Sequence, residues 1–528
     1  MEHGNFLLVS QSPTSHLNPT LHLASTLLSL GSKVTLLITN HALKNISKDQ
    51  LPSGLSLSTF SYSFDNGFTY SDFQLWCVEF ERLGRLALVD LLSSSSQQGL
   101  LPITCIVNTL LIPWVAQVAR EFHVSTAVLW IQSVAVFDVY YYYFNGYNDV
   151  IRNGYKEDDS NLLSSNIWLP GLPLMNSFEE KMQIFKEEDN VPILVNSFDA
   201  LEHDALSAIG TFNLIPIGPL VSLPLGCEVS TKQQSISCFQ DGQQAREDCI
   251  KWLNSKPDSS VVYIAFGSIS KLSKEQTKEI VGAFLECSYP FLWSLRMDDI
   301  RDENLSSYFN VELQAQGKIV PWCSQVEILS HRSVGCFVTH CGWNFTIECV
   351  AVGVPTVAWL LWADQATNAK MMEDVWKIGV RVKKSSDGEG MVERKEITRC
   401  LRMIMDMEDD SKGKGKQLRI NATKWQRLAM EAANGSSFVN LKAFVNKVVQ
   451  SRNLKNLKIS HTHPDSFIKM RFHRLMVEDC FCQSGLSKTT HSHNRNHSNP
   501  FMSGIINNNV HYSGYISPSS YNFEFIKK

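Results

Sequence analysis

Apolar and polar positions alternate along the chain in blocks whose lengths suit buried strands and amphipathic helices. The apolar run at 5–10 is followed by a polar loop, by apolar residues at helical spacing in 20–30, and by another apolar run at 33–39. This order predicts a strand, a helix and a second strand. The strand-then-helix pattern returns at 103–122. Alternation of this kind is typical of a doubly wound parallel sheet.

Local signals mark both ends of the first predicted helix. Asn18 and Pro19 form a pair that often caps a helix and opens its first turn, so we expect the helix to begin there. Gly31 follows the last apolar position, which predicts that the helix ends just before it.

The alternation of strand and helix signals then stops and later resumes. Residues 221–246 are polar, aperiodic and contain Gly and Ser, so we interpret them as an interdomain linker. After them, strand and helix signals alternate again, which predicts a second domain at 247–435 beside the first at 1–220. The predicted fold class is therefore α/β, with two Rossmann-like, doubly wound parallel sheets.

The end of the chain has a different character. A helix at 436–450 is expected to pack back toward the N-terminal domain. Residues 451–528 are rich in His, Asn and Ser without periodicity, and we interpret them as a mostly disordered tail. Its His-x-His pairs and the Cys480-x-Cys482 pair could bind metal, but they lack the spacing of a structural zinc site, so we expect no metal.

Composition narrows the class of protein. The 528 residues carry a formal net charge of −4, and a pI of about 6.4 gives no electrostatic reason to expect nucleic acid as a partner. No run approaches the ~18 apolar residues of a membrane-spanning helix. The 13 Cys are scattered in apolar contexts, and the first residues lack the segments of a signal peptide. We therefore expect a cytoplasmic protein with reduced thiols and no integral membrane association.

The stretch 339–348, THCGWNFTIE, places unusual chemistry between a predicted strand and a predicted helix. Its CGWN portion is expected to form the turn at the carboxyl end of a parallel strand, where ligands bind in such sheets. The following helix offers unpaired N–H groups to an anion. Gly342 allows close backbone approach, and His340 and Asn344 add donors. Glu348, on the same helix face as Asn344, suits a ribose diol, so the stretch predicts a nucleoside diphosphate site.

Neighbouring predicted strands end in residues of matching chemistry. Trp322 offers a ring on which a base could stack, and Gln325 offers an amide. Asp364 and Gln365 follow the next strand and suit sugar hydroxyls, and Ser268 follows the first strand of the second domain. Alone, Trp322 is more often a packing residue, but the set at successive strand ends favours ligand binding. The competing interpretation is a dinucleotide oxidoreductase. The sequence has no G-x-G-x-x-G motif after the first predicted strand of either domain, which counts against it.

Residues 322–365 resemble the plant secondary product glycosyltransferase box, with its H-C-G-W-N, G-V-P and D-Q elements. That box marks the UDP-sugar-dependent family 1 glycosyltransferases. The resemblance extends over about residues 5–450, and YYYYFNGY and VNSFDALE are similar to the subgroup of anthocyanin 5-O-glucosyltransferases, crocetin glucosyltransferases and hormone-ester-forming enzymes. It implies a GT-B fold, in which an acceptor-binding domain (1–220) faces a UDP-sugar-binding domain (247–435) across a cleft.

The resemblance also implies how the nucleotide is held. Uracil is expected to stack on Trp322, and the ribose to meet Gln325 and Glu348. His340 and Asn344 are expected to meet the pyrophosphate. Together with the helix N-terminus, they would stabilise the leaving charge, so no metal or further cofactor is expected.

The sugar is expected to meet Trp343, Asp364 and Gln365. In this family a terminal Gln goes with a preference for glucose. The full set of expected donor-binding residues is Ser268, Trp322, Cys323, Gln325, His340, Gly342, Trp343, Asn344, Phe345, Glu348, Asp364 and Gln365.

His16 falls on the catalytic histidine of the resembled family. An acceptor hydroxyl is a poor nucleophile until a base removes its proton, so His16 is the expected base in a reaction that inverts the anomeric centre. Thr109 stands where much of the family has an Asp that orients this histidine. If the acceptor is a carboxylate, it is already ionised and needs the base less.

Some positions depart from the family pattern. Ser15 replaces a usual Gly, Phe345 a usual Ser, and Leu360 a usual Pro, and the 173–195 segment is shorter than in relatives. At Phe345 the backbone N–H can still face phosphate, but the side chain cannot donate a hydroxyl bond. Reduced activity is therefore an open alternative.

The predicted function is transfer of glucose from UDP-glucose to a hydroxyl or carboxyl of a small plant metabolite. A flavonoid or anthocyanin, a carotenoid acid and a hormone acid are the candidate acceptors. The expected partners are UDP-glucose and this acceptor, for a monomeric enzyme. The alternative is a non-catalytic GT-B homologue that binds UDP-sugar or aglycone.

Overall fold

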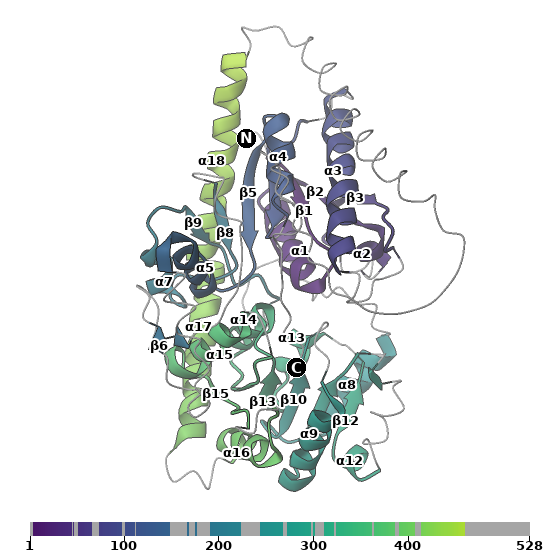
Figure 1. Ribbon diagram of the computed structural model, residues 1–528, viewed down its shortest axis with the longest axis vertical. Helices are drawn as coiled ribbons and strands as arrows, with labels where there is room; N and C mark the ends of the chain where they lie inside the picture. The colour runs from purple at the N-terminus through teal and green to yellow at the C-terminus, as the bar shows by residue number, and fades with distance from the viewer. Residues whose placement is uncertain are drawn as a thin grey trace, which may run out of the picture. The chain divides into compact units, whose positions relative to one another are not determined.

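The structure is a computed structural model, shown in Figure 1. It describes residues 4–44, 46, 51–65, 73–97, 101–110, 112–147, 166–167, 175–176, 191–222, 243–267, 272–296, 299–300, 311–321, 324–361, 364–385, 390–406 and 413–459. Within these ranges, no helix combines the length and apolar content needed to cross a membrane.

The N-terminal half is built on seven parallel strands in the order β3-β2-β1-β4-β5-β8-β9. The strands are β1 (Asn5–Val9), β2 (Lys33–Thr39), β3 (Ser56–Phe60), β4 (Cys105–Thr109), β5 (Ser125–Trp130), β8 (Ile193–Val195) and β9 (Leu214–Pro216). All residues of β1 and β4 are buried, as expected for central strands that are covered on both faces.

The C-terminal half repeats this plan with six parallel strands in the order β12-β11-β10-β13-β14-β15. The strands are β10 (Val261–Ala265), β11 (Phe291–Ser294), β12 (Lys318–Val320), β13 (Val334–Thr339), β14 (Thr356–Ala358) and β15 (Gly379–Arg381). The predicted pair of doubly wound parallel sheets is therefore confirmed.

Helices lie between the strands of both sheets, and further helices follow the last strand, β15 (Figure 1). In the N-terminal half they are α1 (Thr14–Ser29), α2 (Asn40–Lys44), α3 (Phe73–Gln97), α4 (Trp114–Glu121), α5 (Val134–Tyr142), the π-helical η3 (Tyr143–Tyr147) and α7 (His203–Ala208). From residue 243 onward they are α8 (Gln243–Asn254), α9 (Lys274–Cys287), α12 (Val311–Gln316), α13 (Gln325–Leu329), α14 (Trp343–Val352), α15 (Gln365–Lys370), the π-helical η4 (Met371–Val375), α16 (Arg394–Met405), α17 (Lys414–Asn434) and α18 (Ser436–Ile459). A short antiparallel pair, β6 (Asn166–Ile167) and β7 (Met175–Asn176), stands apart from both sheets.

Helix α1 begins earlier than its predicted cap at Asn18. Its N-cap is Pro13, whose carbonyl accepts from the N–H groups of His16 and Leu17. Asn18 and Pro19 therefore lie inside the helix, and the predicted start was wrong. The predicted end was correct, because α1 stops at Ser29 and Gly31 adopts a left-handed φ of 81°.

Other boundaries also differ from expectation. Helix α14 begins at Trp343, so the residues predicted as the end of the turn form its first turn instead. Helix α8 starts at Gln243, inside the predicted linker, most of which (223–242) lies outside the described residues. Helix α18 continues to Ile459, past the predicted tail boundary at 451, and the rest of that tail is outside the described residues.

The N-terminal part of α18 contacts the edge of the first sheet. Ser437 Oγ donates to the Gly218 carbonyl, and Asn440 Nδ2 donates to the Pro216 carbonyl at 2.9 Å. The Phe444 ring lies 6.3 Å from the Phe6 ring. These contacts tie the helix after the second sheet to the first half of the chain.

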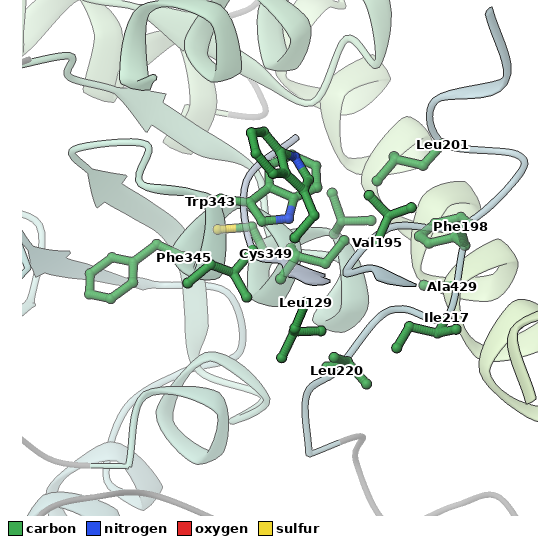
Figure 2. Close-up of a cluster of buried hydrophobic side chains, with 14 of the residues drawn as sticks. Leu129, Val195, Phe198, Leu201, Ile217, Leu220, Trp343, Phe345, Cys349 and Ala429 are labelled. Atoms are coloured by element: carbon green, nitrogen blue, oxygen red, sulfur yellow. The ribbon is translucent and has the colours of Figure 1, made fainter. Parts of the chain in front are cut away.

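A shared apolar cluster joins the two halves (Figure 2). Phe198 and Leu201 contribute from the N-terminal half, and Trp343 and Cys349 contribute from α14. Figure 2 shows the Phe345 side chain directed away from the N-terminal residues of the cluster. Helix α14 therefore presents one face to this shared core.

Each sheet has a point where the direction of winding reverses, between β1 and β4 in the first and between β10 and β13 in the second. Ligands of open α/β sheets bind outside the strand ends at such points. His16 follows β1 and Thr109 is the last residue of β4, while Gly267 follows β10 and His340 follows β13. The fold thus brings the candidate residues to the two switch points.

Candidate active site

His16 and Thr109 meet at the first switch point. The His16 Nδ1 atom lies 3.1 Å from Thr109 Oγ1, and both residues are buried. Burial lowers the pKa of His16 to about 4, because an imidazolium loses solvation there. The ring is therefore neutral at physiological pH. If Nδ1–H donates to the threonine oxygen, Nε2 keeps its lone pair for an acceptor proton.

His340 occupies the second switch point against two glycines. A Cβ atom on Gly267 would lie 2.9 Å from its Nε2 atom, and one on Gly342 would lie 2.6 Å from it. Gly267 also has a φ of 81°, which favours glycine. Burial lowers the pKa of His340 to about 4, and its Nδ1 atom has no hydrogen-bond partner among the described residues.

The first turn of α14 has no side-chain cap. Gly342 is its N-cap, and no acidic residue lies in its first turn. The first internal bond runs from Thr346 N–H to the Gly342 carbonyl at 2.9 Å. The N–H groups of the preceding helical residues and the helix dipole therefore suit an anion.

Cys341, which sequence reasoning did not single out, has a left-handed φ of 65°. Its N–H donates to Thr339 Oγ1 at 3.1 Å, and its carbonyl accepts from Asn368 Nδ2 at 2.9 Å. These bonds hold a backbone conformation that is rare for a residue with a side chain, as is often found at functional sites. No local sequence signal predicts it, because Gly and Asn are the residues that favour this region.

Gln325 and Glu348, both expected at the ribose, lie in contact. Gln325 Nε2 donates to Glu348 Oε2 at 2.5 Å, and Tyr263 OH donates to Gln325 Oε1 at 3.4 Å. Burial raises the pKa of Glu348 to about 7, against the lowering effect of the Gln325 bond. The pair forms a polar group at the side of α14 that suits a diol.

Asp364 and Gln365 are both buried at the start of α15. Asp364 Oδ2 accepts from Asn368 Nδ2 at 2.9 Å, and Gln365 Oε1 accepts from the Leu361 N–H at 2.9 Å. Burial raises the pKa of Asp364 to about 6, although the Asn368 bond lowers it. The Asn368 bond thus holds the Asp364 carboxyl group in place, and this group ionises as the pH rises toward neutrality.

The side chains of Trp343 and Phe345 are engaged in packing. Trp343 Nε1 donates to the Asn196 carbonyl at 2.8 Å, which leaves the backbone N–H as the polar group of Trp343 available to a sugar. The Phe345 ring packs edge-on against His340, with ring centroids 4.7 Å apart, and lies 5.9 Å from Phe337. The Phe345 ring therefore helps to hold the His340 ring in place.

Asn344 connects the donor turn to the helix of His16. Pro19 has no N–H, so the Ser15 carbonyl lacks its usual partner inside α1. Asn344 Nδ2 donates to that carbonyl at 2.9 Å, while its Oδ1 has no partner among the described residues. This contact spans 329 positions of sequence and places the two candidate sites next to each other.

Three expected donor residues cannot be placed. Ser268, Trp322 and Cys323 lie outside the described residues. Within the described ranges, no cluster of three or more His, Cys, Asp or Glu side chains has a geometry that could hold a metal ion.

Asp138 on α5 is a buried acid that the sequence analysis did not use. It is fully buried, and neither carboxyl oxygen has a hydrogen-bond partner among the described residues. Burial, with the nearby Glu202, raises its pKa to about 9. Between its ordinary value of 3.8 and this value, the folded state holds a proton that the unfolded state releases. Folding stability should therefore fall as pH rises through this window.

We expect Asp138→Asn to raise the melting temperature, and to do so more at pH 8 than at pH 5. The amide cannot ionise, so the variant escapes the cost that grows with pH. Thermal unfolding at both pH values measures the difference. Asp90→Asn, an exposed carboxylate on α3, is the matched control and should show no such trend. An equal shift at both pH values would contradict the prediction.

Two doubly wound parallel sheets in one chain, with the neutral His16 imidazole at one switch point and the N-terminus of α14 at the other, fit a two-domain glycosyltransferase of the GT-B class. Comparisons with known proteins agree. Residues 231–396 match the family model described as UDP-glucoronosyl and UDP-glucosyl transferase. The chain belongs to this family, and its activity is glycosyl transfer from a UDP-sugar.

Three relatives match about 85% of the chain. UDP-glycosyltransferase 75C1 of Solanum lycopersicum is 42% identical over 483 residues, which are 85% of this chain and 100% of the relative. Crocetin glucosyltransferase, chloroplastic, of Gardenia jasminoides is 42% identical over 84% of this chain and 97% of its own. Phloretin 4'-O-glucosyltransferase of Malus domestica is 41% identical over 85% and 98%.

Solved structures show the same fold. Os79 from O. sativa in complex with UDP matches with a TM-score of 0.69 and 28% identity, and it covers 84% of this chain and 100% of its own. Its complex with U2F and trichothecene matches with a TM-score of 0.65 and 25% identity, over 84% and 100%.

Proposed function

We propose that this enzyme transfers glucose from UDP-glucose to a hydroxyl or carboxyl group of a small plant metabolite, with inversion at the anomeric carbon. The observation that carries the proposal is the bonded chain from Thr109 through His16 and Ser15 to Asn344. It sets a neutral imidazole beside the turn that suits a diphosphate. The names of two relatives, a crocetin glucosyltransferase and a phloretin 4'-O-glucosyltransferase, support glucose as the sugar and a small plant metabolite as the acceptor.

A UDP-release assay with UDP-glucose tests this proposal. The acceptor panel should contain flavonoids, carotenoid acids and hormone acids, and product analysis should report the anomeric configuration. Turnover well above that of the His16→Ala variant is expected with at least one acceptor. Binding of UDP without any turnover above this variant would overturn the proposal in favour of a non-catalytic homologue.

The donor roles follow the same proposal. Gln325 and Glu348 would hold the ribose, and His340 and Asn344 the pyrophosphate. Asn344 Oδ1 has no partner among the described residues, and Asn344 Nδ2 donates to the Ser15 carbonyl, so Asn344 would orient the His16 helix as well as meet the donor. Asp364 and Gln365 would bind the sugar hydroxyls, with the Trp343 backbone beside them.

The remaining expectations stay proposals. UDP-sugar is the expected co-substrate, without a metal or further cofactor. The acceptor domain is taken as 1–220 and the donor domain as 247–435, with the linker at 221–246 between them. A monomeric state is tested by size-exclusion chromatography with light scattering. A cytoplasmic location is tested by fractionation, with chloroplasts as the alternative that the Gardenia jasminoides relative suggests.

Phe345→Ser is expected to lower the KM for UDP-glucose and to lower stability. A serine hydroxyl at the third helical position can donate to phosphate, a gain of order 1 kcal/mol or about fivefold in KM. The loss of a buried ring that packs on His340 should cost about 3 kcal/mol of folding free energy.

Phe345→Ala separates the two effects, since it removes the ring without supplying a hydroxyl. Initial rates at varied UDP-glucose and thermal melts of both variants provide the measurements. If Ser and Ala give the same KM, the hydroxyl has no role and the backbone N–H alone serves the phosphate.

A further inference from the structure

A buried amide connects the candidate sugar carboxylate to the candidate phosphate turn. Asn368, on α15, is fully buried. Its Nδ2 donates to Asp364 Oδ2 and to the Cys341 carbonyl, each at 2.9 Å. Its Oδ1 accepts from Ser133 Oγ, also at 2.9 Å. Every polar atom of the Asn368 side chain is thus used.

Ser133 fixes which way this amide points. Ser133 is the N-cap of α5, and its hydroxyl oxygen accepts from the Val136 N–H. The hydroxyl proton is therefore free to donate to Asn368 Oδ1. An amide oxygen held on this side must present both N–H donors to Asp364 and to Cys341. A residue of the N-terminal half thereby sets the orientation of donors in the C-terminal half.

The two bonds donated by Asn368 differ in how easily they can be replaced. The Cys341 carbonyl also accepts from Thr346 Oγ1 at 3.3 Å, and the Cys341 N–H is held by Thr339. Asp364 has no other side-chain donor among the described residues. Loss of Asn368 should therefore leave the turn largely in place but release the Asp364 carboxylate.

We propose that Asn368 is a positioning residue that aims the Asp364 carboxylate at the sugar of the donor, with Ser133 setting its amide orientation. The inference rests on the proposed contact between Asp364 and the sugar. Asn368 itself contacts neither sugar nor nucleotide. Its effect is transmitted through Asp364, so the sugar is affected more than the UDP portion.

Asn368→Asp tests the proposal, because it keeps the size of the side chain but removes both N–H donors. We expect kcat/KM for UDP-glucose to fall about 10–100-fold, in line with losing a charge-assisted bond, while the Kd for UDP changes by less than about threefold. Ser133→Ala should give a smaller loss, about three- to tenfold, of the same kind. The measurements are donor kinetics, calorimetric binding of UDP, and a thermal melt.

Asn421→Asp is the matched control. Asn421 lies on the exposed side of α17, and its Nδ2 donates to the Lys377 carbonyl at 2.9 Å. This bond involves neither Asp364 nor Asn368. This control should keep the parental kinetics. If Asn368→Asp fails to fold, Ser133→Ala carries the test alone. Equal losses of UDP affinity and of UDP-glucose kcat/KM, in either variant, would mean a structural role and overturn the proposal.

A double-mutant cycle separates this inference from the proposed function. Asp364→Asn alone should lower kcat/KM, and adding Ser133→Ala to it should cost less than about threefold more if both act on one carboxylate. Independent, additive losses would overturn the coupling between Ser133, Asn368 and Asp364. Parental kinetics in Asp364→Asn would instead remove the assignment of Asp364 to the sugar.

Discussion

Replacing His16 with alanine is expected to lower kcat for a hydroxyl acceptor by about 10²–10⁴, the usual contribution of a general base. The Kd for UDP should stay within about threefold, since the imidazole is bonded to Thr109 and not to the donor turn. Steady-state kinetics with the best acceptor of the panel, together with calorimetry for UDP, measures both quantities.

The ring environment shapes this result. With a pKa of about 4, His16 is neutral across physiological pH, so no proton must be removed before it can act. Protonation of His16 should therefore lower kcat only as the pH falls toward that pKa. Thr109 can orient the ring through Nδ1, but a neutral hydroxyl stabilises the imidazolium less than the Asp found in much of the family.

Two further variants test the role of His16. His22, on the same helix, is also buried with a pKa of about 4, so His22→Ala controls for the loss of a buried imidazole from α1. Thr109→Val keeps the shape and removes the hydroxyl, and should cost about tenfold in kcat. A carboxylate acceptor should lose much less than a hydroxyl acceptor on His16→Ala. Parental kcat in His16→Ala with a hydroxyl acceptor would disprove the base assignment.

Regular elements were predictable from the sequence because their signals are local. The run at 33–39 is β2, and the run at 5–10 contains β1. The cap of α1 was misplaced because Asn18 and Pro19 resemble a helix start when only neighbours are considered. Backbone bonds to Pro13 begin the helix sooner, and the carbonyl that Pro19 leaves open is filled from a distant segment.

The grouping of the candidate residues was predictable where they follow strand ends, and not where partners distant in sequence decide the orientation of a side chain. Gln325 and Glu348 were both expected at the ribose, and they lie in contact. The indole of Trp343, by contrast, is taken up by the Asn196 carbonyl, which nothing near it in sequence indicates. Asn368 lies outside the recognised box at 322–365, and Cys341 lies inside it without a predicted role. Their importance depends on bonds that only the folded chain brings together.

Replacing Glu348 with glutamine is expected to raise the KM for UDP-glucose about 10–100-fold with little change in kcat. A carboxylate forms charge-assisted bonds to a ribose diol, and an amide of the same size forms weaker ones and must share its donors. The ribose is bound equally in ground and transition states, so the loss should appear in KM. Glu327→Gln, on α13 and paired with Arg246, is the control and should leave the KM unchanged.

The same residue should make donor binding depend on pH. Burial raises the pKa of Glu348 to about 7 in the free enzyme, so a large fraction is protonated below this pH. The diol requires the carboxylate as acceptor. Donor affinity should therefore rise with pH through about 7, seen in kcat/KM for UDP-glucose and absent from kcat at saturating donor.

Glu348→Gln should remove the rise in kcat/KM near pH 7. A second rise, caused by ionisation of Asp364, should remain at lower pH, because the pKa of Asp364 is raised only to about 6. His340 and His16, each with a pKa lowered to about 4, remain neutral throughout and cannot produce either limb. The profile of kcat/KM between pH 5 and 8 thus distinguishes a ribose carboxylate from a sugar carboxylate. A limb near pH 7 that persists in Glu348→Gln would mean that a group other than Glu348 controls the pH dependence of donor binding.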